Sequence, residues 1–212
     1  TKYVRELEPK EITISVGGEI GEVGKENSNE NELRAYLDNF NDCLEKSMHG
    51  AKTISKISIQ TGTSHGGVPG PDGKVVDVSL DFKTLENLSR ISRQEYGLAG
   101  AVQHGASTLP GSLFNKFPEL ETAEIHLATD FQNMIYDHEL FPKNLKEEIY
   151  THLRKKFSSE KKVTDTDEQF IYKTRKKGFG EFKSRFWDLS DEIKSEISKD
   201  LESKVENLFT QL

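Results

Sequence analysis

Short apolar runs alternate with longer stretches of helical spacing over roughly the first two thirds of the chain. The runs are β-branched or small and apolar, and glycine or polar residues bound each of them; they lie at 12–17 (ITISVG), 54–60 (ISKISIQ), 98–103 (LAGAVQ) and 123–127 (AEIHL). Such runs are typical of buried strands. A strand-helix alternation of this kind predicts a parallel sheet built from four βα units.

The stretches between the runs carry apolar residues every three or four positions. Leu33, Leu37, Phe40 and Leu44 mark one helix, which a side chain within residues 27–29 (NSN) can cap. A second helix is expected over residues 82–96, after a segment at 75–80 that could pair briefly. For the helix after the last run, Thr129 or Asp130 offers a cap.

From residue 143 onward the pattern changes, because glycine and β-branched runs nearly vanish. Helical spacing with dense charge continues over residues 145–157, 167–183 and 189–212, and a polar connection joins the first two. Trp187 lies on this spacing and is expected to pack or to meet another subunit. We therefore divide the chain into an α/β region at 1–142 and a helical C-terminal extension at 143–212.

Charge and composition exclude several partners. The net charge of −7 gives no general attraction for nucleic acid or anionic lipid, and no apolar run approaches the length of a membrane span. Cys43 is the single cysteine, so a reducing, cytoplasmic location is expected. The start lacks the layout of a signal peptide, and Thr1 in place of methionine suggests residues upstream.

Chemically active side chains follow three of the predicted strands, where parallel sheets carry their sites. Carboxylates at Glu19, Glu22 and Glu26 follow the first strand, His65 the second, and His104 the third. Imidazoles together with a carboxylate suit a catalytic zinc that polarises a carbonyl group and stabilises an enolate. A lyase or an isomerase could use such a site.

Each of these residues also has a structural explanation. A loop histidine is often only a surface residue, and the acidic residues could form a solvated turn. His49 with Gly50 fits a helix C-cap better than a site. His126 lies in a strand among apolar neighbours, where a hydrogen-bonded core histidine is the usual case.

Glycines beside the two loop histidines allow close approach of the backbone to a ligand. If the four strands are the last four of a barrel, a phosphate would lie between the loops that follow its final strands. This places the predicted phosphate site at residues 105–107 (GAS) and 128–130 (ATD).

Four motifs carry a resemblance to a known family. GEIGEVGKEN, GTSHGG, QHGASTLP and IHLATDFQ resemble, in order and spacing, the second half of class II fructose- or tagatose-bisphosphate aldolases. The resemblance covers about residues 12–135 and implies the C-terminal half of a TIM (β/α)8 barrel, its last four βα units, followed by the helical extension. It implies a cytoplasmic enzyme of carbohydrate metabolism and glycolysis.

The resemblance also implies a site. His65 and His104 match the family's zinc-binding histidines, and Glu19 matches a carboxylate that can bind a displaced or second metal. Gly66, Gly105, Ala106 and Ser107 match loops that hold a dihydroxyacetone phosphate portion and a monovalent cation. Thr129 matches a phosphate contact, and Ala128 beside it belongs to the phosphate site predicted at residues 128–130. The expected reaction is reversible aldol cleavage of a phosphorylated ketose, with Glu26 as proton carrier.

Three departures bear on the activity. The family's asparagine in the last strand, which touches the ketose, is His126 here, and Asn27 replaces one of two paired acids. The third zinc histidine and a catalytic aspartate belong to the family's first half, before Thr1. A fragment of four βα units would therefore be inactive alone, and association of the parent protein into a homo-oligomer through the helical region is expected.

Two alternatives remain beside the aldolase. One is a related sugar-phosphate epimerase or isomerase, which His126 and Asn27 favour. The other is a non-catalytic relative that keeps the barrel. Metal content and assay against phosphorylated ketoses would separate them.

Overall fold

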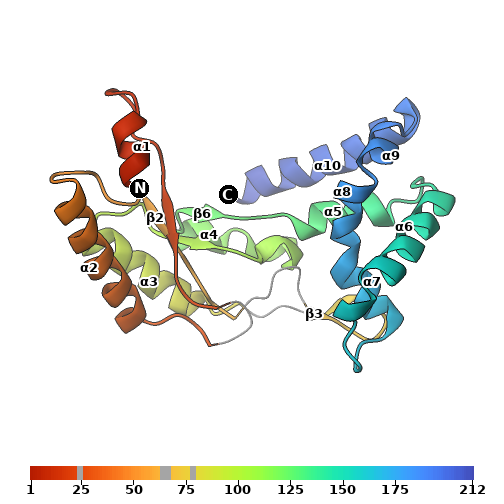
Figure 1. Ribbon diagram of the computed structural model, residues 1–212, viewed down its shortest axis with the longest axis horizontal. Coiled ribbons are helices and arrows are strands. Elements are labelled where there is room, and N and C mark those ends of the chain that lie inside the picture. The colour runs from red at the N-terminus through yellow and green to blue at the C-terminus, as the bar shows by residue number, and fades with distance from the viewer. Residues whose placement is uncertain (23–25, 63–67, 77–79) are drawn as a thin grey trace. The chain divides into compact units, whose positions relative to one another are not determined.

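The computed structural model describes residues 1–22, 26–62, 68–76 and 80–212, which form two compact units (Figure 1). We call the first the sheet unit and the second the helical unit. The two are described separately below.

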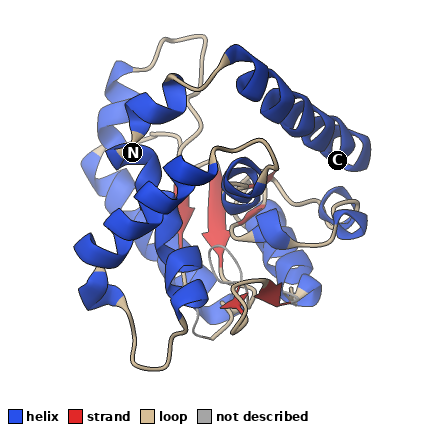
Figure 2. Cartoon of the chain, turned by 90° about the vertical axis from the view of Figure 1, so that its right-hand side faces the viewer, coloured by secondary structure: helices blue, strands red, loops and turns tan. Residues whose placement is uncertain are grey.

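The sheet unit is built on four parallel strands whose order in space is their order in the chain. They are β1 (Gly17–Glu19), β2 (Lys56–Ile59), β5 (Ala101–Gln103) and β6 (Glu124–Ile125). The helices of this unit are α1 (Lys2–Leu7), α2 (Glu30–Ser47), α3 (Phe82–Gln94) and α4 (Lys116–Glu119). Figure 2 shows how short the strands, in red, are beside the helices. This arrangement confirms an α/β fold with a parallel sheet and is compatible with part of a (β/α)8 barrel.

Local sequence explains where α2 begins. The Asn29 side chain accepts a hydrogen bond from the Glu32 amide, and the Glu32 carboxylate accepts one from the Asn29 amide, each at 3.1 Å. This reciprocal capping box satisfies two amides that the helix would leave unpaired. The predicted apolar stripe is confirmed, because Leu33 and Leu37 are fully buried.

One face of the sheet packs against helices. Ile57 and Ala101 are fully buried, and the Ala101 amide donates to Ser89 Oγ of α3 at 3.1 Å. Leu85, Leu88 and Ile91 of α3 are buried as well. Because side chains alternate along a strand, residues one position away point to the opposite face. That opposite face carries Glu19, Ser58 and Glu124.

The first strand differs from the prediction of residues 12–17. Strand β1 begins only at Gly17, and both backbone groups of Ile14 before it are bonded to side chains. Arg5 Nη1 donates to the Ile14 carbonyl at 2.8 Å, and the Ile14 amide donates to Glu8 Oε2 at 2.8 Å. Such local bonds compete with sheet pairing. The backbone bonds of Glu8 are also the main reason that its pKa lies below the ordinary value.

Gly18 of β1 lies close to Tyr36 of α2. A Cβ atom there would lie 2.8 Å from the Tyr36 hydroxyl and 2.9 Å from Ile54 Cδ1. We expect Gly18→Ala to lower the free energy of unfolding by about 1 kcal/mol, since only flexible side-chain ends must move. Gly17→Ala is the matched control, because its Cβ would meet nothing closer than 3.6 Å. Urea denaturation measures both, and equal stability of the two variants would contradict the expected crowding.

The helical unit contains a small hairpin and the C-terminal helices. The hairpin strands are β3 (Val68–Pro69) and β4 (Val75–Val76), which pair antiparallel. The helices are α5 (Thr129–Asp137), α6 (Lys143–Lys156), α7 (Asp167–Thr174), α8 (Gly178–Glu181), α9 (Lys183–Trp187) and α10 (Asp191–Gln211). Short 3-10 turns span Ala106–Thr108, Gly111–Leu113, Ser158–Glu160 and Arg175–Lys177.

The continuous helix expected at residues 167–183 is broken into α7, a 3-10 turn and α8. The break occurs where Arg175 turns into the unit, with its side chain 9% exposed. Its guanidinium donates two parallel hydrogen bonds to Asp137, at 2.8 and 2.9 Å, and one to Asn133 at 2.5 Å. The Tyr136 and Tyr172 rings lie 5.6 and 5.0 Å from it. A bidentate ion pair between the buried Arg175 and the exposed Asp137 thus joins α5 to the end of α7.

Aromatic rings build the core around this ion pair. Tyr136 is fully buried, and Phe179 and Phe186 meet its ring edge-on at 5.0 and 5.7 Å. The Tyr136 hydroxyl donates to the Arg175 carbonyl at 2.9 Å. Trp187, in contrast, is 70% exposed, so the expectation that it packs is not met within the chain.

Candidate functional site

Three of the predicted site residues come together on the polar face of the sheet. The strand register aligns Glu19 with Ser58, Ser58 with Val102, and Val102 with Glu124. Side chains in register share a face, and so do residues two positions further along each strand. His104 and His126 therefore lie on the same face as Glu19, at the carboxyl ends of β5 and β6.

Glu19, His104 and His126 form a contact chain. Glu19 Oε1 lies 3.7 Å from His104 Nδ1. The His104 ring stacks on the His126 ring, with centroids 4.4 Å apart and planes inclined by 27°. The contact chain places a carboxylate and two imidazoles within reach of a common ligand.

His126 is a surface residue here and not the core histidine that its apolar neighbours favour. Its side chain is 49% exposed, because β6 ends at Ile125. Nε2 of His126 is bonded to Glu124 Oε1. Since an ionised carboxylate only accepts hydrogen bonds, Nε2 carries the proton, and in the neutral ring Nδ1 is left as an acceptor.

Glu124 and Lys56 complete this face, and sequence reasoning did not identify either. Lys56 of β2 forms an ion pair with Glu124 of β6. The hydrogen bond from Lys56, followed by that from His126, holds the pKa of Glu124 below its ordinary value. Alternation along the strand could have indicated Glu124, because it stands two positions before His126.

Glu26 and Asn27 lie next to the end of β2. The Ser28 amide donates to the Gln60 carbonyl at 2.8 Å, and the Gln60 amide donates to Ser28 Oγ at 2.9 Å. Glu26 is exposed, whereas Asn27 Nδ2 donates to Asp81 Oδ2 at 3.0 Å. Asp81 caps α3, and hydrogen bonds from Thr84 lower its pKa. Asn27 is thus committed to a structural contact.

The predicted phosphate site consists of two loops, at residues 105–107 and 128–130. Gly105 has φ +72°, a conformation that favours glycine, and begins the turn to Ala106–Thr108. Ala106 and Ser107 are buried. Ala128 precedes α5 and gives it no side-chain cap, so the expected capping by Thr129 or Asp130 is wrong. Asp130 is instead paired with Lys204 of α10 at 2.9 Å.

His65 and Gly66 lie outside the described residues, so the test of a metal site rests on Glu19 and His104. Zinc binds both imidazole nitrogen and carboxylate oxygen. His104 Nδ1 and Glu19 Oε1 lie 3.7 Å apart, and binding to one ion would bring the two side chains closer together. Among the residues that the structure describes, no group of three His, Cys, Asp or Glu side chains is ready to hold a metal. The donor types fit zinc, and a further ligand would be required.

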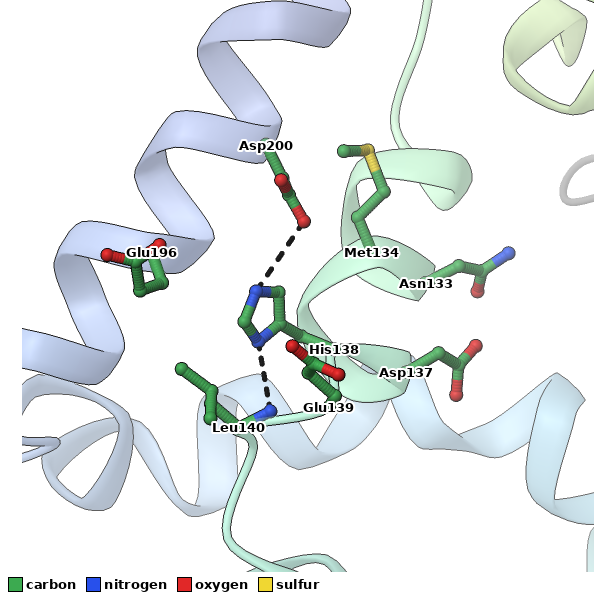
Figure 3. A pocket seen from close by; sticks show the side chains of 8 residues that line it. All are labelled: Asn133, Met134, Asp137, His138, Glu139, Leu140, Glu196 and Asp200. Atoms are coloured by element: carbon green, nitrogen blue, oxygen red, sulfur yellow. Dashed lines mark hydrogen bonds and ion pairs between the residues drawn. The ribbon is translucent and has the colours of Figure 1, made fainter.

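A pocket of ≈ 520 Å³ in the helical unit is lined by His138 and Asp200, among other residues (Figure 3). His138 Nδ1 accepts from the Leu140 amide at 3.2 Å, and Nε2 faces Asp200 Oδ2 at 3.5 Å. Both ring nitrogens therefore have partners, one after α5 and one on α10. His138 links these two helices.

No helix in the described ranges has the length and apolar character to cross a bilayer.

Comparison with known proteins adds one family. A search of curated proteins found no match. The model of the family "Fructose-bisphosphate aldolase class-II" matches residues 1–204. The match extends well beyond the resemblance at residues 12–135 and takes in most of the helical region. With nearly the whole length matched, the chain belongs to the class II fructose-bisphosphate aldolase family.

Proposed function

We propose that the chain is part of a zinc-dependent aldolase that cleaves a phosphorylated ketose into dihydroxyacetone phosphate and an aldehyde. Family membership supports a lyase-type enzyme. The observation that carries the proposal is the contact chain of Glu19, His104 and His126 on one face of the sheet. In this proposal the chain supplies the last four βα units of a barrel (residues 1–142) and a helical extension (143–212).

His65 and His104 would hold the zinc, with Glu19 as an additional carboxylate. When bound, zinc supplies a Lewis acid for the ketose carbonyl and for the enediolate charge. In cleavage a base takes the proton of the hydroxyl next to the breaking bond. That O–H electron pair forms the aldehyde carbonyl, and the C–C pair passes to the enediolate. Glu26 returns a proton to carbon, which completes the ketone.

The remaining contacts follow from the same proposal. Gly66, Gly105, Ala106 and Ser107 would hold the phosphorylated part of the substrate, and a monovalent cation, through backbone groups. Ala128 and Thr129 at the start of α5 would contact phosphate. His126 would face a substrate hydroxyl with Nδ1. We further propose a cytoplasmic homo-oligomer, which the exposed Trp187 and Phe209 support.

An epimerase or isomerase is the second candidate. His126 and Asn27 motivate it, because they replace the family's asparagine that touches the ketose and one of its two paired acids. The third candidate, a non-catalytic relative, predicts no bound metal.

One assay separates the three candidates. The full-length protein should contain zinc and release dihydroxyacetone phosphate from fructose 1,6-bisphosphate or another member of a panel of phosphorylated ketoses. Interconversion of ketoses without release of a triose would favour the epimerase. Absence of zinc together with absence of turnover would favour the non-catalytic relative.

A further inference from the structure

His126 is held at three points although its side chain is 49% exposed. Its amide donates to the Gln103 carbonyl at 2.9 Å, its ring stacks on that of His104, and its Nε2 is bonded to Glu124 Oε1. A surface side chain loses conformational entropy when it is held in this way. Among the residues that the structure describes, none bonds to Nδ1 of His126. The contacts therefore fix the ring and leave one nitrogen for a ligand.

The Glu124 carboxylate joins this ring to a lysine and uses one oxygen for each. Oε1 is bonded to His126 Nε2, and Oε2 forms the ion pair with Lys56 Nζ. The bond from Lys56, and after it that from His126, keeps the pKa of Glu124 below its ordinary value. The carboxyl group is therefore ionised at neutral pH and can only accept hydrogen bonds. Lys56 lies on β2 and Glu124 on β6, with β5 between them, and all three strands belong to the sheet unit.

The tautomer of His126 decides what the ring can bind. With the proton on Nε2, the Nδ1 lone pair accepts a hydrogen bond from a hydroxyl group and repels a second acceptor, such as a carbonyl or phosphate oxygen. A ring that could rotate or change its tautomer would accept either kind of group. A sugar presents hydroxyl groups, which can supply the donor that this nitrogen requires.

We propose that Glu124 and Lys56 are positioning residues for substrate recognition: they hold His126 as the Nε2-protonated tautomer, so that Nδ1 accepts from a hydroxyl group of the ketose. This inference rests on the proposed function. Neither Glu124 nor Lys56 touches the substrate, and both act through His126. A ring that is already fixed loses less conformational freedom when the ketose binds, so the two residues should tighten binding.

The test reverses the hydrogen bond at His126 and keeps the ion pair. Exchange of the two charges, Lys56→Glu with Glu124→Lys, puts an ammonium group beside Nε2. An ammonium group only donates, so Nε2 must accept from it and the ring proton moves to Nδ1. Nitrogen NMR shifts of the imidazole in the full-length protein report the tautomer, recorded at about pH 9, above the range in which histidine ordinarily titrates. We expect the proton on Nε2 in the wild type and on Nδ1 after the exchange.

Kinetics should follow the tautomer. After the exchange, kcat/KM for ketose cleavage should fall about tenfold, mainly through a higher KM, because the bond to the hydroxyl group is made in the bound substrate and in the transition state alike. Zinc content should equal that of the wild type, since neither Lys56 nor Glu124 is a ligand in the proposed site.

A double-mutant cycle separates positioning from a merely structural role. In a His126→Ala background the same exchange should cause no further loss of kcat/KM, because the residue through which it acts is gone. Glu124→Gln keeps an amide oxygen that accepts from Nε2, so it should keep the tautomer and a KM close to that of the wild type. Glu124→Met, which offers no such acceptor, replaces the exchange if the exchanged protein does not fold.

The matched control is an exchange of another ion pair in the sheet unit. Lys116 and Glu119 pair within α4 at 2.7 Å, and both side chains are about half exposed. Lys116→Glu with Glu119→Lys should leave the tautomer of His126, the KM and the zinc content as they are in the wild type.

The outcomes are distinct. A reversed tautomer together with a higher KM, both dependent on His126, supports the inference. An unchanged tautomer, an unchanged KM, or an equal loss in the His126→Ala background overturns it and leaves the proposed function standing. A wild-type protein that neither binds zinc nor releases a triose removes the proposed function and, with it, the inference.

Discussion

Replacement of His104 by alanine should lower kcat/KM for ketose cleavage by on the order of 10³-fold, because the site loses an imidazole donor for the metal that stabilises the enediolate. Zinc content should fall in parallel. His104 lies against both Glu19 and His126, so it stands at the centre of the contact chain. Steady-state kinetics and metal analysis of the full-length protein measure both effects.

His49→Ala is the matched control. His49 also precedes a glycine, but its side chain is 94% exposed and pairs with Glu45 at the end of α2. This variant should keep full activity and zinc content. Removing His65 and His104 together should cost little more than removing His104 alone, since ligands of one metal act as a unit. Normal zinc content and turnover in that double variant would exclude the proposed enzyme.

Replacement of Asp137 by asparagine should destabilise the helical unit by about 2 kcal/mol. Loss of one partner of a buried ion pair costs about 3–5 kcal/mol. Here the Arg175 side chain is 9% exposed but that of Asp137 is 53% exposed, and solvent screening reduces the effect. Urea denaturation monitored by circular dichroism gives the free energy of unfolding. Asp167→Asn removes a pair with Arg154 that is exposed on both sides and should cost well under about 1 kcal/mol.

The same ion pair predicts a pH dependence. Burial raises the pKa of Asp137, but hydrogen bonds and charge from Arg175 outweigh burial and leave that pKa below its ordinary value of 3.8. A carboxyl group with a lowered pKa stabilises the fold fully above its unfolded pKa, and this contribution is lost as the pH falls through the folded pKa. The stability difference between wild type and Asp137→Asn should therefore shrink below about pH 4. A difference that grows as the pH falls would contradict the assignment.

Sequence patterns located the sheet because one face of its strands is buried against helices. Ile57 and Ala101 pack under α3, so their runs are apolar and easy to recognise. The strand ends were less predictable. Residues 12–16 have the composition of a strand, yet the Arg5 and Glu8 side chains bond to the carbonyl and the amide of Ile14 in the middle of this run. Contacts between residues that are far apart in the sequence cannot be recognised from the spacing of apolar residues.

In the candidate site, too, some residues could be predicted from the sequence and others could not. His104 was predicted from its place after a strand, and its contact with Glu19 agrees with that place. Glu124 and Lys56 were missed, because each looks like an ordinary charged surface residue until the register brings them together. The hydrogen bonds from Thr166 and Gln169 to the hairpin were missed for a similar reason, since their acceptors are the Pro71 and Pro69 carbonyls about one hundred residues away.

The ion pair between Lys56 and Glu124 has a consequence for assembly of the sheet. Strands of two to four residues make few ladder hydrogen bonds, and a slip by one residue would turn every side chain of a strand to the other face. Lys56 and Glu124 stand on strands either side of β5, two strand spacings or roughly 10 Å apart, and can meet only in the observed alignment. Exchange of the two charges, with lysine at 124 and glutamate at 56, would preserve that alignment, whereas either change alone would set like charges against each other while the strands are pairing.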